Sequence, residues 1–326
     1  MAGPGSPFEA PDDAEAAKRG YTGTVRHPQR KCALAGDDTH QIKPVGNGID
    51  DDPARNEAMG NGKITTLTTL LADWLADLRG TLSFFTRLPM PGTTDHGPPD
   101  FGRAARTAPL AGAVVGLVGG AVFASVAMMG LTPFVAAFAA IGATIIVTGG
   151  LHEDGLADTA DGLGAFDRER RLDIMRDSRI GSYGVLALIV TIGAKAALLA
   201  QITGESGILG VVAAMVAIEG TSRLAALYPL HALSPARSDG LAHSANAPDR
   251  GAMIQGMIMA IVLVIVCIVP TIGIVATVLA VVAAIAIALA GTRWADHMLG
   301  GHTGDIAGAI QQTTVLVMLA AIAAAG

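Results

Sequence analysis

Two long uncharged stretches dominate the hydrophobic pattern of this chain. Residues 107–151 and 251–292 contain no Asp, Glu, Lys, Arg or His. A helix needs about 20 apolar residues to cross the hydrocarbon core of a bilayer, so each stretch is long enough for two crossings. A turn signal lies near the middle of each, Gly-Leu-Thr-Pro ending at Pro133 and Pro-Thr-Ile-Gly starting at Pro270. Each stretch therefore predicts two membrane-spanning helices joined by a tight turn.

Three further apolar segments extend this pattern to a bundle. The predicted fold is an all-α integral membrane protein with about seven transmembrane helices. The spans are expected near residues 108–129, 133–151, 183–202, 207–230, 252–270, 272–291 and 306–325. Composition agrees, since 51% of residues are hydrophobic, 15% are charged and the mean hydropathy is +0.49. These values exclude an ordinary soluble domain.

The polar positions gather first at the N-terminus. Residues 1–62 are rich in Gly, Pro, Asp and Asn and show no hydrophobic periodicity, which predicts a disordered tail. Met59 is an alternative start of translation. N-terminal sequencing that finds Met1 or Ala2 would exclude this alternative. From Ile64 to Phe85 apolar residues recur at helical spacing, which predicts an amphipathic helix on the membrane interface or, equally, a helix packed against the bundle. The membrane catalytic domain is expected over residues 63–326.

Lys and Arg set the predicted orientation of the bundle. With the N-terminus in the cytoplasm, every cluster of arginines that borders a span lies inside. The outer connections near residues 130–133, 203–206 and 270–273 contain no Lys or Arg. Positive residues favour the cytoplasmic side, so the connections that follow the second and sixth spans are expected to face the cytoplasm.

The connection after the second span carries the most distinctive polar pattern. Eight of the 28 acidic residues lie between Glu153 and Asp177. Asp154, Asp158 and Asp161 are spaced i, i+4, i+7, so on a helix they fall within about 60° of each other. Carboxylates stacked in this way repel unless a cation lies among them, and hard oxygen ligands suit Mg²⁺ or Mn²⁺. The pattern favours a metal site over a solvated acidic loop.

Nearby residues supply candidate contacts for phosphate. Arg176 and Arg179 are spaced i, i+3 and could grip phosphate oxygens. The glycine-rich segment 300–304 precedes the last apolar helix, and helix N-termini bind phosphate through free N–H groups. Asp305 could add a fourth carboxylate to the metal. A plain turn is the alternative, but the predicted orientation places this segment on the same side as the acidic stretch.

Three charged residues fall inside predicted spans. Lys195 and Glu219 lie at similar depth in adjacent helices, and an unpaired charge there costs at least about 2.5 kcal/mol. We therefore predict that they form a structural pair, with an ion pathway as the alternative. Arg223 lies closer to the inner end, where it could snorkel or reach a substrate phosphate. The two cysteines, Cys32 and Cys267, are poor candidates for a disulfide or a metal site.

Four segments together resemble the cobalamin synthase family, formally adenosylcobinamide-GDP ribazoletransferase. They are FTRLP at residues 85–89, HEDGLADTADG at 152–162, MRDSRIG at 175–181 and GHTGD at 301–305. The resemblance runs from about residue 75 to the C-terminus, with the motifs in the family's order and at its separations. The acidic motif and MRDSRIG are highly specific. The N-terminal tail lies outside the family pattern, and Glu153 occupies a variable position.

The resemblance implies a Mg²⁺-dependent enzyme of the bacterial cytoplasmic (inner) membrane. It would join adenosylcobinamide-GDP to α-ribazole, or its 5′-phosphate, and release GMP. Asp154, Asp158 and Asp161 would hold the metal, while Asp305 would complete the site or act as a base. Arg176, Arg179 and Arg87 would bind phosphates. The implied partners are the corrinoid nucleotide, α-ribazole, the lipid bilayer and other late cobalamin-pathway enzymes.

Two other functions fit parts of the pattern. A CDP-alcohol phosphotransferase also uses aspartates at a membrane face, but this chain lacks the Ala-Arg that follows the first Asp-Gly in that family's motif. A cation transporter could use Lys195, Glu219 and the aspartates, yet it would place acids in broken helices at the midplane. No nucleic-acid function is predicted, because the basic residues are scattered.

Overall fold

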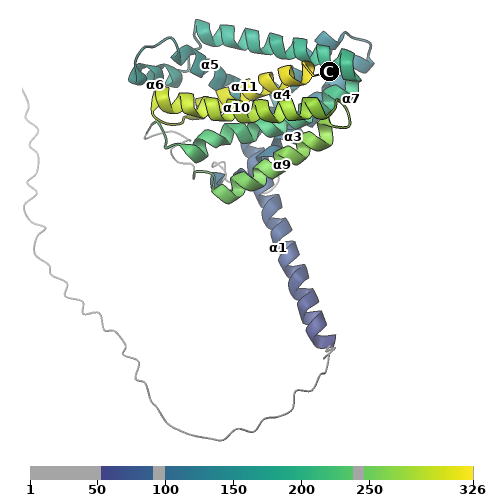
Figure 1. The fold of residues 1–326 in the computed structure, drawn as a ribbon. Helices are drawn as coiled ribbons and strands as arrows, with labels where there is room; N and C mark the ends of the chain where they lie inside the picture. The colour runs from purple at the N-terminus through teal and green to yellow at the C-terminus, as the bar shows by residue number, and fades with distance from the viewer. Residues whose placement is uncertain (1–52, 91–99, 238–245, 326) are drawn as a thin grey trace, which may run out of the picture. The chain divides into compact units, whose positions relative to one another are not determined.

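The structure, a computed structural model, describes residues 53–90, 100–237 and 246–325, without the side chains of residues 53–67. These residues form helices and no strand beyond an isolated bridge between Pro235 and His302. The predicted all-α class is therefore confirmed. Figure 1 shows the helices and labels all but α2. They are α1 (Pro53–Phe85), α2 (Phe101–Ala104), α3 (Ala108–Met128), α4 (Pro133–Thr148), α5 (Leu151–Gly162), α6 (Arg168–Arg176), α7 (Ser182–Ala232), α9 (Arg250–Ile268), α10 (Ile274–Leu299) and α11 (Gly304–Ala323).

The apolar runs form the expected membrane helices. Among the described residues, five helices are long and apolar enough to cross a membrane: α3, α7, α9, α10 and α11. The pair α4 and α5 passes the same test only when joined, and the two helices meet at 94°. Because α5 carries the acidic residues, we treat α4 as the apolar part of this pair and α5 as a polar segment outside the spans.

Helix α7 contributes two arms rather than one long rod. Its backbone leaves the helical conformation at Gly207, where φ is 68° and ψ is −172°. Lys195 and Glu219, each twelve residues from Gly207, line one small cavity, as do Leu199 and Met215. The arms therefore fold back on each other. Counting them separately gives the seven apolar helices that the sequence predicts.

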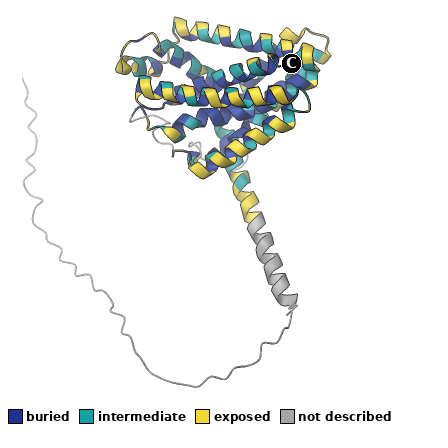
Figure 2. Cartoon of the chain, in the orientation of Figure 1, coloured by how far each residue is buried: buried dark blue, intermediate teal, exposed yellow. Residues whose placement is uncertain are grey.

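Small residues allow the helices of the core to pack closely. A Cβ atom at Gly112 of α3 would clash with the backbone oxygen of Glu219 in α7, and one at Gly116 would clash with that of Met215. Without a hydrophobic force between helices in lipid, such close backbone approach is what holds membrane bundles together. The buried residues face inward between the helices (Figure 2).

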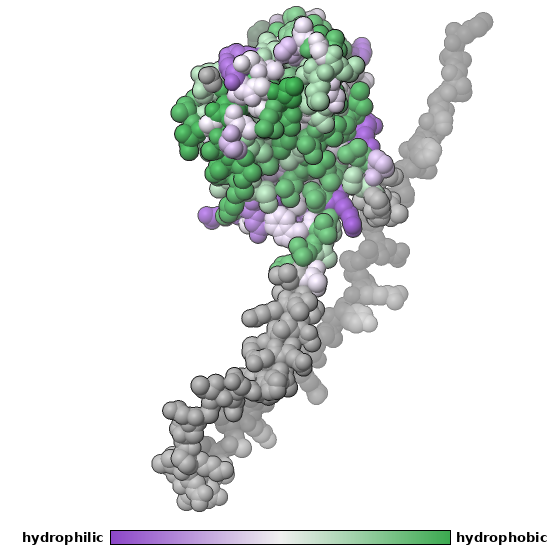
Figure 3. Space-filling view, turned by 90° about the vertical axis from the view of Figure 1, so that its right-hand side faces the viewer, coloured by the Kyte–Doolittle hydropathy of each residue, from purple (hydrophilic) through white to green (hydrophobic). Residues whose placement is uncertain are grey.

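The outward faces of the bundle are apolar as well. Exposed Leu186, Ile189, Ile258 and Val282 lie on α7, α9 and α10. Figure 3 shows hydrophobic residues over most of the visible face of the bundle, with hydrophilic residues at its margins. An apolar patch of this extent marks contact with lipid or protein rather than water. It agrees with a bundle embedded in a bilayer.

Helix α1 begins at Pro53, inside the segment expected as a polar tail, and residues 1–52 lie outside the described part of the chain. Its C-terminal end packs against the bundle, where Phe85 is buried with Phe101. Asp77 forms ion pairs with Arg103 and Arg106. Earlier along the same helix Leu70, Leu71 and Leu75 are exposed. The end of this helix that contains Phe85 is therefore packed against the bundle, while its place on the membrane interface stays a prediction.

Candidate active site

Two glycines turn the chain from α4 into the acidic segment. Gly149 and Gly150 both have positive φ, 68° and 71°, a conformation that costs little only for glycine. The amide of Gly150 bonds to the carbonyl of Ile145 at 3.0 Å, which closes the end of α4. The guanidinium of Arg87 lies directly against Gly149, where a side chain would clash with it. This turn brings Arg87 to the start of α5.

The acidic segment is a helix, as the spacing of its aspartates predicts. Asp154, Asp158 and Asp161 all lie on α5, and Glu153 and Asp154 fall in its first turn. Acidic side chains there interact favourably with the helix dipole. Glu153 points elsewhere, since its carboxylate accepts a hydrogen bond from Gln312 at 2.8 Å. Glu153 therefore makes its contact apart from the aspartates of this helix.

A glycine contact joins α5 to α11. A Cβ atom on Gly155 would lie 2.8 Å from the backbone oxygen of Asp305 and 3.2 Å from the Cα of Gly308. The two backbones can approach this closely only because both positions lack a side chain. The contact brings Asp305 to the carboxylates of α5, as the predicted orientation requires. The structure thus gathers four aspartates, Asp154, Asp158, Asp161 and Asp305, whose charges interact.

The charge of this cluster is felt most at Asp158. The pKa of this carboxyl is raised to about 7, chiefly by burial and then by the charges of Asp154, Asp305 and Asp161, in that order. Only Arg237 acts in the opposite direction. Carboxylates that hinder each other's ionisation in this way form a site with an excess of negative charge, which a cation would relieve.

Arg237 is a cation of the site that was not predicted from the sequence. Its Nη2 lies 3.2 Å from Oδ2 of Asp305, and its Nε is buried without a partner. The preceding residue is fixed in place, because the amide of Ala236 bonds to the carbonyl of His302 at 2.9 Å. Arg168 donates to the carbonyls of both Ala236 and Leu299. The only sequence signal for Arg237 is its place at the inner end of the fourth predicted span.

Asp161 differs from the other three aspartates in its contacts. One of its oxygens accepts from the amide of Gly181 at 2.7 Å and the other from Gly184 at 2.9 Å. These are amides at the start of α7, which have no partner within the helix. Side chains at Gly181 or Gly184 would collide with the carboxylate. Asp161 therefore anchors the MRDSRIG segment and the start of α7 to the carboxylate cluster.

The cluster has the donors that Mg²⁺ prefers but does not form a closed cage. Among the described residues, no three His, Cys, Asp or Glu side chains converge in a geometry that would hold a metal ion. Mg²⁺ is commonly bound through one or two carboxylates, with substrate phosphates and water completing its shell. Asp154 and Asp158, one helical turn apart, fit that mode of binding.

A cavity of about 630 Å³ adjoins the start of α5. Asp154 and Arg87 line it, together with Gly149, Gly150 and Ile180. The lining of this cavity therefore includes residues from three of the sequence segments, namely FTRLP, the acidic motif and MRDSRIG. The cavity is large enough for part of a nucleotide-sized ligand.

The other predicted phosphate contacts lie elsewhere. Arg179 pairs with Asp177 at 2.7 Å in the segment before α7, with 86% of its side chain exposed. Arg176 is exposed at the end of α6. Arg223 is fully buried and pairs with Glu219 at 2.6 Å. The structure thus brings Arg87 to the cavity, whereas the other three arginines do not line it. Their contact with phosphate stays a prediction.

The predicted pair of Lys195 and Glu219 is not a direct ion pair. Lys195 donates to Gln312, and Glu219 binds Arg223. The two residues belong to one buried network, because Gln312 donates to Gln311 at 2.9 Å, and Gln311 lies 3.4 Å from Glu219. Glutamine side chains both donate and accept, so they satisfy both charges at once. The network ends at Glu153 of α5, next to the carboxylate cluster.

Comparisons with known proteins cover the same residues. The family model for cobalamin-5-phosphate synthase matches residues 77–323. Adenosylcobinamide-GDP ribazoletransferase of Allorhizobium ampelinum is 40% identical over 78% of this chain and 99% of its own length. The proteins of that name from Azorhizobium caulinodans and Brucella anthropi are each 40% identical, over 75% and 76% of this chain and 94% and 96% of their own lengths. No solved structure matches the chain.

The matched region contains the whole membrane bundle from the end of α1 onward, including the four aspartates, Arg87 and Arg237. The family model covers most of the chain, and the relatives align over nearly their full length. The chain belongs to the cobalamin-5-phosphate synthase family, a family of membrane transferases.

Proposed function

We propose that this enzyme transfers the adenosylcobinamide phosphate group from adenosylcobinamide-GDP to α-ribazole, or to its 5′-phosphate, and releases GMP. The names of the relatives supply the reaction class. The observation that carries the proposal is the meeting of Asp154 and Asp158 with Asp305 and Arg237 across the Gly155–Gly308 contact. Carboxylates and a cation at one point of a membrane face suit the transfer of a diphosphate-activated group.

In this reaction one phosphorus–oxygen bond forms and one breaks. A ribose hydroxyl oxygen attacks the phosphorus that carries the cobinamide arm. The bond from that phosphorus to the bridging oxygen breaks, and GMP leaves with the bridging oxygen. The hydroxyl proton passes to a carboxylate of the cluster, for which we propose Asp305, held on the facing helix by Arg237. Such transfers depend mainly on positioning and on neutralising charge.

The residues of the site divide these tasks. Asp154 and Asp158 would hold Mg²⁺, or Mn²⁺ in its place, which when bound would neutralise charge on the diphosphate. Arg87, in the wall of the cavity, and Arg237, with its free Nε, would contact phosphate oxygens. Asp161 would keep α7 and α5 in register through its bonds to Gly181 and Gly184.

The orientation of the bundle completes the proposal. Nucleotide substrates are charged and soluble, so they must reach the site from an aqueous compartment. The distribution of Lys and Arg supports a position of the carboxylate cluster at the cytoplasmic face of the inner membrane. There the enzyme would receive its corrinoid from the other late enzymes of the pathway.

The direct test is an assay of the full chain in nanodiscs. The protein would receive adenosylcobinamide-GDP and Mg²⁺ with either α-ribazole or α-ribazole 5′-phosphate, and GMP and the corrinoid product would be measured by chromatography. We expect both products in equal amounts, loss of both with EDTA, and recovery with Mg²⁺ or Mn²⁺. Folded protein that forms no GMP with either acceptor, or that forms it equally in EDTA, would contradict the proposal.

A further inference from the structure

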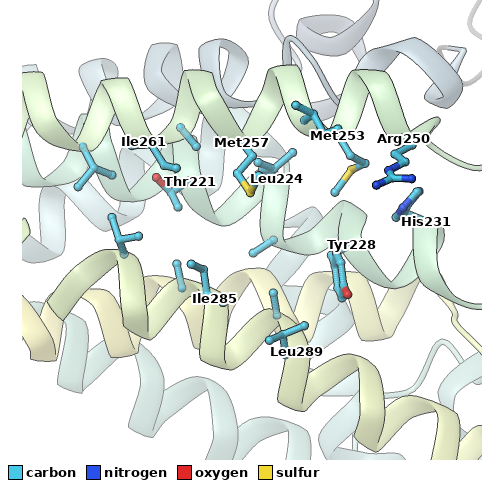
Figure 4. A pocket seen from close by; sticks show the side chains of 17 residues that line it. Thr221, Leu224, Tyr228, His231, Arg250, Met253, Met257, Ile261, Ile285 and Leu289 are labelled. Atoms are coloured by element: carbon cyan, nitrogen blue, oxygen red, sulfur yellow. The ribbon is translucent and has the colours of Figure 1, made fainter. Parts of the chain in front are cut away.

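An apolar groove of about 400 Å³ lies between α7, α9 and α10, apart from the carboxylate cluster (Figure 4). Its floor is formed by buried Leu224, Ala260 and Ala284, while its rim is formed by exposed Met257 and Ile285. The groove is therefore open toward the side of the bundle, which in a membrane is toward lipid. None of the residues proposed for the transfer reaction lines it.

One end of the groove is cationic. Arg250 and His231 lie there side by side, with Tyr228 close to them (Figure 4). Arg250 is exposed and forms no ion pair with any residue that the structure describes. The neighbouring Asp249 caps α9, because its Oδ1 accepts from the amide of Ala252 at 2.7 Å, and its carboxylate is not paired with Arg250. The charge at this end is thus available to a ligand.

A further cation extends this end. Arg293 follows Leu289, a lining residue of α10, by four residues, so it lies one turn farther along the same helix face. It is exposed. His231 donates its Nδ1 hydrogen to the carbonyl of Pro248 at 2.7 Å, since a carbonyl can only accept. That bond holds the imidazole at the mouth of the groove.

The groove has the length of one membrane leaflet. Its lining on α9 runs from Arg250 to Val264, which is about 21 Å at the rise of an α-helix. Half of a bilayer, including the head-group layer, is about 20–22 Å thick. The cationic end lies at the same end of the bundle as the carboxylate cluster, because α7 and α10 both end there and α9 and α11 both begin there.

We propose that this groove binds one anionic phospholipid, with an acyl chain between α9 and α10 and its phosphate at Arg250 and His231. The groove and the lipid match in chemistry along their whole length. The groove is apolar where an acyl chain would lie and positive where the head group would lie. Basic pockets between transmembrane helices are the sites where acidic lipid head groups bind. The bound lipid fills a space between three helices that side chains leave open.

The test measures lipid retention by the full chain. Protein in nanodiscs of equal parts dioleoyl phosphatidylglycerol and dioleoyl phosphatidylcholine would be released into the gas phase, and the retained lipid would be identified by native mass spectrometry. Two variants probe the two ends of the groove, Arg250→Gln at the cationic end and Ala284→Leu at the apolar floor. Their matched controls are Arg170→Gln and Ala286→Leu, which change exposed residues of α6 and α10 outside the groove.

We expect the wild type to retain one phosphatidylglycerol per chain in preference to phosphatidylcholine. Arg250→Gln should weaken that preference about fivefold, which corresponds to about 1 kcal/mol for one basic residue near the membrane surface. Ala284→Leu should abolish retention, and both controls should behave as the wild type. Because Arg250 is exposed, its replacement tests the proposal even if Ala284→Leu fails to fold.

Three results would overturn the proposal. The first is equal retention of the two lipids by the wild type, or retention of phosphatidylglycerol that neither variant changes. The second is a dimer that Ala284→Leu dissociates, which would assign the groove to a second copy of this chain. The third is a higher KM for a substrate in Ala284→Leu with unchanged lipid retention, which would assign the groove to the substrate.

Discussion

Asp158 lies among three other carboxylates, and the fold makes its charged form unfavourable. Its pKa is raised to about 7 in the folded protein, from 3.8 for an aspartate in water. The folded state therefore binds a proton more tightly than the unfolded state, so the stability that this group contributes is lost as the pH rises through 7. In EDTA we expect Asp158→Asn to raise the thermal unfolding temperature, and to raise it more above about pH 8 than below about pH 5.5.

Asp173→Asn is the matched control for this measurement, since Asp173 is an exposed carboxylate of α6. It should leave the unfolding temperature unchanged at both pH values. A variant at Asp158 that is less stable than the wild type at high pH would show that the carboxylate is stabilised by its neighbours rather than repelled by them.

Arg237 pairs with Asp305 of the cluster, and its guanidinium can form contacts beyond that bond. Its Nε is buried and unpartnered, so a substrate phosphate could complete its contacts. We expect Arg237→Gln to lower kcat by about 10²-fold, the usual effect of removing one donor to developing charge. Arg237→Lys should recover only part of the loss, because an ammonium group cannot form two parallel bonds. Steady-state kinetics would measure both, with exposed Arg170→Gln as the control, and unchanged kcat in Arg237→Gln would remove Arg237 from the site.

Sequence pattern found some of these residues and could not find others. Asp154, Asp158 and Asp161 were accessible because helical periodicity alone places them on one face. Arg237 gave no local signal, since its partner Asp305 is distant in the chain and their meeting depends on how α7 ends beside α11. The prediction for Lys195 and Glu219 identified two charges inside the bundle correctly but missed the glutamines that bind them. An uncharged polar side chain within an apolar run does not indicate its role by pattern alone.

Helices α5 and α11 form the site only because they touch at glycine. A methyl group on Gly155 would meet backbone atoms of Asp305 at 2.8 and 3.0 Å, and backbone cannot give way as a flexible side chain can. We expect Gly155→Ala to lower transfer activity strongly although it removes no functional group, because the helices must separate. Gly142→Ala in α4 is the control, since its Cβ would meet nothing within 4 Å.

Gly142→Ala should retain activity and gain stability, because alanine is favoured over glycine within a helix by about 1 kcal/mol. Activity and unfolding temperature of both variants would be measured in the same nanodiscs. If Gly155→Ala is as active as the wild type, the close contact between α5 and α11 is not what assembles the site.

The buried network ties α5 to the middle of the bundle. Gln312 accepts from Lys195 and donates to Glu153 and Gln311. Gln312→Leu would leave a buried ammonium and a buried carboxylate without partners, and each unsatisfied group costs about 1–3 kcal/mol or more. We expect a markedly lower unfolding temperature, measured beside Gln201→Leu at an exposed position. Equal stability of the two variants would show that water or another side chain replaces Gln312.

At the level of helices, hydrophobic length was the reliable signal. Runs without charge predicted both ends of α3 and α9 and the start of α10 to within about two residues, because only a helix satisfies the backbone in lipid. Helix α10 continues to Leu299, beyond its predicted end at residue 291. The break between α4 and α5 was not predicted as a 94° bend. Two adjacent glycines mark a turn, but the angle between the helices depends on the surfaces that α5 finds on α7 and α11.

The molecule as a whole separates two environments. Its sides are apolar and suited to lipid, while its acidic chemistry is concentrated at one end of the bundle. This arrangement allows a membrane enzyme to act on a charged, soluble nucleotide without moving that charge into the hydrocarbon core. On insertion scales, each charge placed in the core costs about 2.5–3.5 kcal/mol. The proposed reaction uses adenosylcobinamide-GDP, a charged nucleotide, so an open polar end suits that chemistry.

The rate of GMP release by Asp158→Asn tests this assembly most directly. The wild type, Asp158→Asn and Asp173→Asn would be compared in nanodiscs with adenosylcobinamide-GDP, α-ribazole and saturating Mg²⁺. The carboxylate cluster predicts that Asp158→Asn is folded, at least as stable as the wild type in EDTA, and slower by about 10²-fold or more. Asp173→Asn should match the wild type. An Asp158→Asn enzyme that releases GMP at the wild-type rate would show that transfer takes place elsewhere in the molecule.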